Sequence, residues 1–362
     1  MATATHGSAI LFPSEAFNPS EVIRVLRLEE TMSHGGVTGL YGVSTMFIAE
    51  LELLQRTQNK TKPKEKEFKR LTKGIAAGSS VPRKLMERLR SEMGLEDLAI
   101  CYGMTETSPV SCMTALDDPV EKKVDSVGKL MPWVEAKIVS PADGHLCEIG
   151  EKGELVVSGY LVMEGGYFGD EVKTAEVLKI EYGDVGEVKE GGKKWIYTGD
   201  EAEMDQDGYV RITGRIKDLI IRGGENIHPT EIENVLLGMS EVKEASVVGV
   251  GSEKYGEEVA VFVAAHGDVE VGSDDAGLGG KGEGKLERGG QGGEAEAEGK
   301  KILTKEMVKE YVRGQLSNHL VPKYVFWIDE FPKTASGKIQ KFLLRERGDL
   351  LLKGEVKGDR GV

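Results

Sequence analysis

The sequence predicts an α/β protein that contains part of a doubly wound large domain with a β-barrel-like subdomain, followed by a small α+β C-terminal domain. Three observations predict this class. Helix and strand patterns alternate through residues 1–127, short strands follow one another through residues 128–216, and helices and strands mix again through residues 217–350. Residues 351–362 are expected to form a tail.

The first part begins with alternating strand and helix patterns. Residues 8–12, a serine followed by four apolar residues, predict an internal strand, and residues 19–28 have helical periodicity. Residues 38–42 then predict a short strand before a helix that starts near Val43. A further apolar strand ends near residue 77, and Pro82 predicts the start of the helix that follows it.

Short strands dominate the second part, at residues 135–139, 153–158 and 209–213. The third part has strand patterns at residues 218–222, 246–250 and 258–263, and helix patterns at residues 228–237 and 305–312. Within it, residues 267–300 are rich in Gly, Glu and Lys and contain almost no large apolar residue. We therefore expect a flexible surface insertion in which nothing packs. Its glycine-rich matches to nucleotide-binding patterns lack the strand and helix that should flank them, and we attribute them to chance.

One predicted hairpin carries the most informative pair of side chains. Residues 205–208 are a turn signal between two strands that hold Asp200 and Arg215. If the loop has two residues, either Gln206-Asp207 or Asp207-Gly208, side-chain alternation places Asp200 and Arg215 on one face. A carboxylate beside a guanidinium suits a ribose diol next to a phosphate, although most such pairs are surface salt bridges.

Residues 102–108 carry groups suited to phosphate chemistry. Gly103 permits close backbone approach, Thr105 offers a hydroxyl to a phosphate oxygen, and Glu106 offers a hard oxygen of the kind that Mg²⁺ accepts. Taken alone the segment is a weak signal, because Thr-Glu is also an ordinary helix start.

Two loops add to this set. Residues 75–82 join a strand to a helix through small residues whose amides would face a planar or anionic ligand. In residues 331–341, Gly337 frees the backbone just before Lys338, a side chain that can be delivered to an anion as a mobile point charge. Each loop is also a common kind of connector, and most lysines on tight loops are simply solvated.

Five segments together resemble one protein family, in order and in spacing. They are Tyr102-Gly-Met-Thr-Glu106, Thr198-Gly-Asp200, Gly214-Arg-Ile-Lys-Asp218, Arg222-Gly-Gly-Glu-Asn-Ile227 and Pro332-Lys-Thr-Ala-Ser-Gly-Lys338. The chain resembles the adenylate-forming enzymes, the AMP-dependent synthetase and ligase superfamily, and within it the medium-chain acyl-CoA synthetases. The resemblance runs from about Ile10 to about Arg347.

The resemblance implies a site for ATP or AMP with Mg²⁺. Asp200 would hold the ribose hydroxyls, and Arg215 would contact the ribose or the phosphate. Thr105 would touch the α-phosphate, and Glu106 would bind Mg²⁺. The residues implied to line the adenine side are Gly78, Ser79, Ser80, Tyr102 and Gly103.

The resemblance also implies a mobile C-terminal domain that takes part in two reactions. Lys338 would bridge the substrate carboxylate and the α-phosphate while acyl-adenylate and pyrophosphate form. Lys217 would then be the hinge of the domain, and Gly223 and Gly224 would form the backbone edge beside the CoA pantetheine. The implied partners are a medium-chain carboxylic acid and CoA.

One family element is absent from this sequence: the Ser/Thr/Gly-rich loop ending in Pro-Lys that grips the β- and γ-phosphates. The resemblance therefore covers roughly the second half of a family member. Two alternatives stay open beside an acyl-CoA synthetase. One is an adenylating enzyme with an acceptor other than CoA, and the other is a non-catalytic fragment that retains part of a nucleotide or acyl-AMP surface.

Composition bears on nucleic-acid binding, membrane spanning and cellular compartment. A net charge of −14 and a pI near 5.1 argue against a nucleic-acid-binding surface, and no apolar run has the length of a transmembrane helix. Three cysteines in 362 residues are a poor disulfide framework and favour a reducing compartment. We expect an intracellular protein, cytoplasmic or mitochondrial. The residues indicate no particular oligomeric state.

Overall fold

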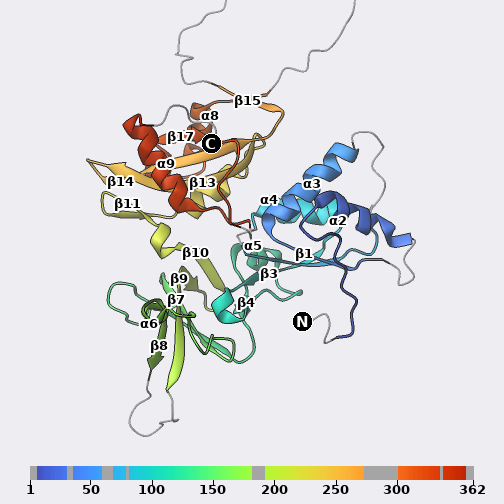
Figure 1. Ribbon diagram of the computed structural model, residues 1–362, viewed down its shortest axis with the longest axis horizontal. Helices are drawn as coiled ribbons and strands as arrows, with labels where there is room; N and C mark the ends of the chain where they lie inside the picture. Colours follow the sequence, from blue (N-terminus) through green and yellow to red (C-terminus); the bar gives the residue numbers. More distant parts are fainter. Residues whose placement is uncertain are drawn as a thin grey trace, which may run out of the picture. The chain divides into compact units, whose positions relative to one another are not determined.

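The computed structural model describes residues 6–30, 36–58, 68–78, 81–181, 192–272, 301–334 and 337–355 (Figure 1). The chain divides into two compact units, Met1–Thr213 and Gly214–Val362. Among the described residues, no helix combines the length and the apolar character needed to cross a bilayer.

The first sheet of the first unit is a five-stranded layer with the order β1-β2-β3-β4-β5. Its strands are β1 (Gly39–Gly42), β2 (Lys73–Ala77), β3 (Asp97–Tyr102), β4 (Cys112–Met113) and β5 (Lys129–Leu130). Strands β1, β2 and β3 are parallel, as expected when helices connect successive strands. The helices are α2 (Pro19–Leu26), α3 (Ser44–Gln58) and α4 (Arg83–Arg88), and they lie on one side of this sheet (Figure 1).

The predicted strand at residues 8–12 is wrong. This segment pairs with no strand in the described part of the chain, and Ile10, Leu11 and Phe12 are exposed. An apolar run raises strand propensity, but a strand exists only where a neighbouring backbone supplies its hydrogen bonds.

The second sheet of the first unit follows the order β10-β9-β7-β6, and β8 pairs with β9. The strands are β6 (Val134–Val139), β7 (Gly153–Gly159), β8 (Leu178–Glu181), β9 (Lys193–Met204) and β10 (Val210–Arg215), with the helices α5 (Val120–Asp125) and α6 (Glu171–Val177). The register of β7 against β9 shifts between Glu154 and Val156, which is a β-bulge. Bulges let a sheet curl, and a curled, barrel-like sheet confirms this part of the predicted fold class.

The second unit contains a sheet with the order β12-β11-β14-β13, and β17 runs parallel to β14. Its strands are β11 (Ile220–Arg222), β12 (Glu225–Ile227), β13 (Val242–Ser252), β14 (Gly256–Ala265) and β17 (Tyr324–Trp327); its helices are α7 (Pro229–Leu236), α8 (Lys305–Arg313) and α9 (Lys341–Lys353). Along β14, Val259, Val261 and Val263 pack in the cluster that includes α7 and α8. The alternating residues Ala260, Phe262 and Ala264 pack in the cluster that includes Leu344 of α9. A strand buried on both faces reads as a continuous apolar run, which is why the sequence predicted it well.

The start of the predicted insertion is structural rather than flexible. Residues 269–271 form β15 (Val269–Val271), which pairs in parallel with β16 (Lys301–Leu303). Val269 and Val271 pack against the α7/α8 cluster, and the amide of Gly272 donates to the carbonyl of Leu303. The expectation that nothing in 267–300 packs is therefore wrong for its first residues, because two valines at strand spacing suffice to bury one face. Residues 273–300 lie outside the described part of the chain.

Glu50 is the most deeply buried acidic residue in the described part of the first unit. Glu50 of α3 is 2% exposed, and its Oε2 atom has no hydrogen-bond partner among the residues that the structure describes. Burial raises the pKa of Glu50 from 4.5 to about 8, because the charged form loses its hydration. At neutral pH the protonated form therefore dominates in the folded chain.

The boundary of the insertion can be tested by two deletions. Removing residues 267–300 eliminates Val269 and Val271 from the core, and we expect it to lower the free energy of unfolding by about 2 kcal/mol or more. Removing only 274–299 and closing the gap with a short Gly-Ser turn retains β15, and closure entropy changes slowly with loop length. Urea unfolding should thus show little change for the shorter deletion. Equal losses in both would contradict the role of β15.

Glu50 predicts a dependence of stability on pH. Between pH 4.5 and about 8 the folded chain keeps a proton on Glu50 that the unfolded chain releases, so stability falls as the pH rises through this window. Glu50→Gln should flatten the fall, measured as urea midpoints at several pH values across it. Glu87→Gln, at an exposed position of α4, is the matched control and should leave the slope as in the parent chain.

Candidate functional site

The carboxyl ends of the parallel strands meet at one edge of the first sheet. Gly42 of β1 pairs with Ala76 of β2, and Ala77 pairs with Cys101 of β3. Gly78 therefore follows β2 at the edge where Tyr102 ends β3, and its φ of +84° favours glycine. Ligands of open α/β sheets bind outside this edge. The predicted residues Ser79 and Ser80 lie outside the described part of the chain.

The turn after β3 is packed too tightly for a side chain at Gly103. A Cβ atom there would lie 1.7 Å from the carbonyl oxygen of Pro109. The buried hydroxyl of Thr107 accepts from the amide of Met104 and donates to its carbonyl oxygen, both at 3.1 Å. Thr105 itself is exposed. The close approach that Gly103 permits is made by the chain's own backbone, and its approach to a ligand stays a prediction.

A hydrogen bond joins this turn to the second sheet. The hydroxyl of Tyr102 donates to Oδ2 of Asp200 over 2.6 Å, and the Asp200 residue is 8% exposed. Burial, followed by the charge of Asp200, raises the pKa of Tyr102 far above its usual range. Tyr102 thus stays protonated and remains a hydrogen-bond donor to the carboxylate. The structure brings together two predicted site residues that are 98 positions apart in the sequence.

The bulge in β9 sets the position of Asp200. Thr198 Oγ1 accepts from the amide of Asp200 at 3.1 Å and donates to the carbonyl of Leu155 at 2.8 Å. Gly199, with a φ of +71°, donates its amide to the carboxylate of Glu154 at 2.9 Å. The Thr-Gly-Asp order therefore has a structural cause. The threonine anchors the bulge, the glycine makes the left-handed step, and the aspartate is held beside Tyr102.

The β9–β10 hairpin corrects the predicted loop length. The amide of Asp205 donates to the carbonyl of Tyr209, which leaves a three-residue loop at 206–208. Gly208 has a φ of +83°, typical of a type I turn followed by a left-handed residue. A third loop residue reverses the alternation, so the argument that placed Asp200 and Arg215 on one face is wrong.

Glu106 has a tyrosine partner that the sequence analysis missed. The hydroxyl of Tyr167 donates to Oε1 of Glu106 over 2.7 Å. Burial and this carboxylate raise the pKa of Tyr167 to about 12. Gly166 permits the arrangement, since its φ is +71° and a Cβ atom would lie 2.2 Å from the Thr174 side chain. The only sequence signal for this partner was the glycine-tyrosine pair before α6, and such a pair has no fixed spacing from Glu106 that would link the two.

Four predicted residues lie at the start of the second unit. Arg215 and Lys217 are exposed, and Lys217 lies in a single 3₁₀ turn, Ile216–Asp218. Gly223 and Gly224 have φ values of +62° and +92° and connect β11 to β12. Two consecutive residues with positive φ are the requirement of a type I′ hairpin turn.

The Gly223–Gly224 turn is anchored from β14. The carboxylate of Glu258, 3% exposed on the side chain, accepts from Arg222 at 2.6 Å and from Lys323 at 3.3 Å. Arg222 also lies over the ring of Tyr255, 4.6 Å from its centroid, and the amide of Gly223 donates to the Tyr255 carbonyl. The sequence alone does not reveal this anchor, because an acidic residue inside an apolar strand has no fixed meaning by itself.

Lys338 lies at the end of a tight turn in the second unit. The amide of Gly337 donates to the carbonyl of Thr334 at 2.8 Å, and the amide of Thr334 donates to the carbonyl of Lys338 at 2.9 Å. Gly337 has a φ of +82°, and Lys338 is exposed. The backbone is therefore fixed while the ammonium group stays in solvent, as predicted for a lysine on a glycine turn.

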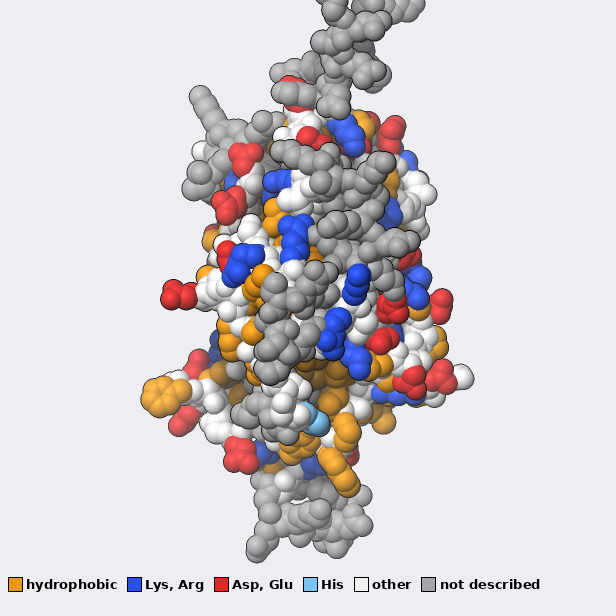
Figure 2. Space-filling model, turned by 90° about the vertical axis from the view of Figure 1, so that its right-hand side faces the viewer, with side chains coloured by type: hydrophobic (Ala, Val, Ile, Leu, Met, Phe, Trp, Pro, Cys, Tyr) orange, Lys and Arg blue, Asp and Glu red, His pale blue; other side chains and the backbone are white. Residues whose placement is uncertain are grey.

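The face drawn in Figure 2 carries both acidic and basic side chains among the described residues.

Comparisons with known proteins identify relatives along nearly the whole chain. Residues 1–168 match the sequence model of the family described as AMP-binding enzyme. The chain is 38% identical to the acyl-CoA ligase sidI of Aspergillus fumigatus, covering 96% of this chain and 51% of that protein. It is 34% identical to the mitochondrial medium-chain acyl-CoA ligase ACSF2 of Rattus norvegicus, over 98% of this chain and 48% of that protein. The chain thus spans about half the length of the curated relatives it matches.

Solved structures have the same fold. The o-succinylbenzoate CoA synthetase of Bacillus subtilis, in complex with its acyl-adenylate intermediate, superposes with a TM-score of 0.67 at 26% identity. The match covers 95% of this chain and 56% of that one. The ATP-bound MatB of Rhodopseudomonas palustris gives a TM-score of 0.67 at 26% identity, over 95% of this chain and 55% of that one.

The Tyr102–Asp200 bond predicts a difference between two tyrosines. Tyr102→Phe removes a hydrogen bond from a buried carboxylate, and we expect the free energy of unfolding to fall by about 1–3 kcal/mol. Tyr209→Phe is the matched control, because its hydroxyl also donates over 2.6 Å but to the half-buried Asp118. Urea unfolding should show the smaller loss for Tyr209→Phe. The reverse order would contradict the importance of the buried pair.

Proposed function

We propose that this chain, whose residues 1–168 match the AMP-binding enzyme family, is the adenylate- and CoA-binding part of an acyl-CoA synthetase. The overall reaction joins a carboxylate and ATP into acyl-AMP and pyrophosphate, and then transfers the acyl group from AMP to CoA. The rat relative is named for medium-chain acids, and we propose the same substrate class here. We also propose an intracellular location; that relative is named mitochondrial.

The observation that carries this proposal is the Tyr102–Asp200 pair at the carboxyl edge of the first sheet. Asp200 would accept hydrogen bonds from the ribose hydroxyls, since a carboxylate is an acceptor at both oxygens. Tyr102 supports this role because its hydroxyl already fixes one oxygen. The aromatic ring of Tyr102, with Gly78 and Gly103 beside it on the same edge, would line the adenine. Ser79 and Ser80 stay proposed members of this lining.

Glu106 has the chemistry that a Mg²⁺ ligand needs. Mg²⁺ prefers hard oxygens and usually keeps several waters, so one carboxylate on a half-exposed turn fits it. The Tyr167 hydroxyl holds one oxygen of this carboxylate, which orients the other. When bound, the metal would neutralise phosphate charge. Thr105, exposed on the same turn, would donate to an α-phosphate oxygen.

Lys338 and Arg215 would supply the remaining positive charge. A carboxylate attacking the α-phosphate is repelled by the phosphates, and an ammonium group placed between them lowers that barrier. The exposed position of Lys338 on a fixed turn supports this role. Arg215 would contact the ribose or the phosphate.

Thioester formation would use another face of the second unit. The CoA sulfur attacks the acyl carbonyl, the carbon–sulfur bond forms, the bond to the AMP oxygen breaks, and the thiol proton is released. Gly223 and Gly224 would form the edge along which the pantetheine passes. Lys217 would be the hinge, and its place in a short turn near the division between the two units supports that role. We likewise propose that the three parts of the chain end at residues 127, 216 and 350.

The experiment supplies a medium-chain acyl-adenylate and CoA to the 362-residue chain and measures acyl-CoA by mass spectrometry. This half-reaction needs no grip on the β- and γ-phosphates, whose loop the sequence lacks. We expect thioester formation above the uncatalysed rate, and little pyrophosphate release from ATP and acid. Transfer to an amine but not to CoA would instead favour an enzyme with another acceptor, and no transfer at all would favour a binding fragment.

Two variants divide the roles of the second unit. Lys217→Pro fixes the φ angle at the hinge, and we expect thioester formation to fall at least tenfold. Lys338→Ala should stay within about threefold of the parent chain, because its charge serves only the attack on the α-phosphate. Equal losses in both variants would contradict this division.

A further inference from the structure

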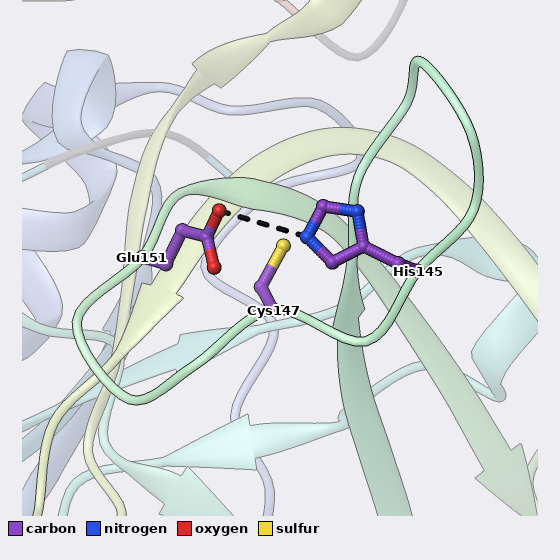
Figure 3. A group of neighbouring side chains, drawn as sticks. All are labelled: His145, Cys147 and Glu151. Carbon is purple, nitrogen blue, oxygen red and sulfur yellow. Dashed lines mark ion pairs between the residues drawn. The ribbon is translucent and has the colours of Figure 1, made fainter.

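A second group of potential ligands lies on the connection between β6 and β7, outside the residues proposed above. His145, Cys147 and Glu151 each direct one donor atom toward the others, and these atoms lie within 4.8 Å of one another (Figure 3). The imidazole Nε2 is 3.7 Å from Oε1 of Glu151. No sequence pattern had singled out these three residues.

The local backbone explains the convergence. The carbonyl of His145 accepts from the amide of Ser140, and the amide of Cys147 donates to the carbonyl of Ile138. Residues 145–147 therefore run extended beside the end of β6, and the period of two places His145 and Cys147 on one face. The chain then turns at Gly150, whose amide is bonded to Met204 of β9, and Glu151 returns toward the pair.

Each ligand is oriented before any ion arrives. Asp143 contacts Nδ1 of His145 at 2.7 Å, which holds the ring so that Nε2 faces the other two groups. Oε2 of Glu151 accepts from the amide of Glu148 at 2.9 Å, which leaves Oε1 on the side of the imidazole. Gly153 makes room for the sulfur, because a Cβ atom at that position would lie 2.8 Å from it.

We propose that His145, Cys147 and Glu151 bind a zinc ion, with water as the fourth ligand. In a tetrahedral zinc site with one sulfur ligand, bonds of about 2.0 Å to nitrogen or oxygen and about 2.3 Å to sulfur separate the ligand atoms by about 3.3–3.5 Å. Nε2 of His145 and Oε1 of Glu151, 3.7 Å apart, are close to that spacing, and all three donor atoms lie within 4.8 Å of one another. A thiolate with an imidazole selects zinc over Mg²⁺ or Ca²⁺, which distinguishes this site from the one proposed at Glu106.

Such an ion would close the connection between β6 and β7. It would link the extended residues 145–147 to the turn at 148–151, and so stabilise one end of the second sheet. The competing account is an ion pair only, in which a protonated His145 rests between Asp143 and Glu151 and no metal binds. The zinc site requires the sulfur of Cys147 as a ligand, whereas the ion pair does not involve it.

The test titrates the full, reduced and metal-free chain with Co²⁺, and then displaces it with Zn²⁺. We expect one equivalent of Co²⁺ to produce a thiolate-to-cobalt charge-transfer band and tetrahedral d–d bands, both removed by Zn²⁺. Cys147→Ser should abolish the charge-transfer band. His145→Ala and Glu151→Gln should each weaken Zn²⁺ binding at least tenfold in a chelator competition, and Asp143→Asn should weaken it about tenfold. Zn²⁺ should raise the melting temperature of the parent chain but not of Cys147→Ser.

His319→Ala is the matched control, since His319 is exposed in the second unit and should leave Zn²⁺ affinity unchanged. The other two thiols, Cys101 and Cys112, are buried and should give no band. If Cys147→Ser does not fold, Glu151→Gln still tests the proposal, because Glu151 is half exposed on a surface turn. Absence of the charge-transfer band in the parent chain, or Zn²⁺ affinity unchanged in Glu151→Gln, would leave the ion pair only and overturn the proposal.

Discussion

The first unit depends on one buried carboxylate and the hydroxyl that satisfies it. Asp200 is 8% exposed, and a charge at that depth is costly unless it is hydrogen-bonded. The 2.6 Å bond from Tyr102 meets this need and links the end of the parallel sheet to the curled sheet. Backbone bonds between Val127 and Val210, and between Val210 and Gly128, hold the same two sheets together. Removal of Asp200 would therefore affect both the contact between the two sheets and the carboxyl edge of the parallel strands beside it.

Elements with strong local signals could be predicted from the sequence. The helix at Pro19–Leu26 has a proline at its start and Asn18 as its cap, and β14 contains an uninterrupted apolar run from Val259 to Ala265, so local chemistry identifies both. The predicted strand at 8–12 is wrong because a strand must pair with a neighbouring strand, and local composition does not reveal whether one is present. The prediction for the β9–β10 hairpin was wrong because its loop has three residues rather than two. One extra loop residue moves every side chain of the following strand to the opposite face of the sheet.

The candidate site shows the same limit at longer range. Motif spacing identified Tyr102, Glu106 and Asp200 separately, but not the contacts Tyr102–Asp200 and Glu106–Tyr167. Those partners are 98 and 61 positions apart, and nothing in one segment encodes its distance from the other. The resemblance to adenylate-forming enzymes supplied the order of the motifs. The bulge at Gly199 and the glycine at 166, which aim the side chains, became visible only in the fold.

The central claim is that Asp200 holds a ribose, and calorimetric titration of the chain with AMP tests it most directly. Asp200→Asn keeps the size of the side chain but removes the charge, and hydrogen bonds to charged groups contribute about 1.5–3 kcal/mol. The account predicts that AMP binds the parent chain and binds Asp200→Asn at least tenfold more weakly. Asp207→Asn, on the exposed hairpin loop, should bind AMP as the parent does. Equal affinity of the folded Asp200→Asn variant and the parent chain would contradict the account.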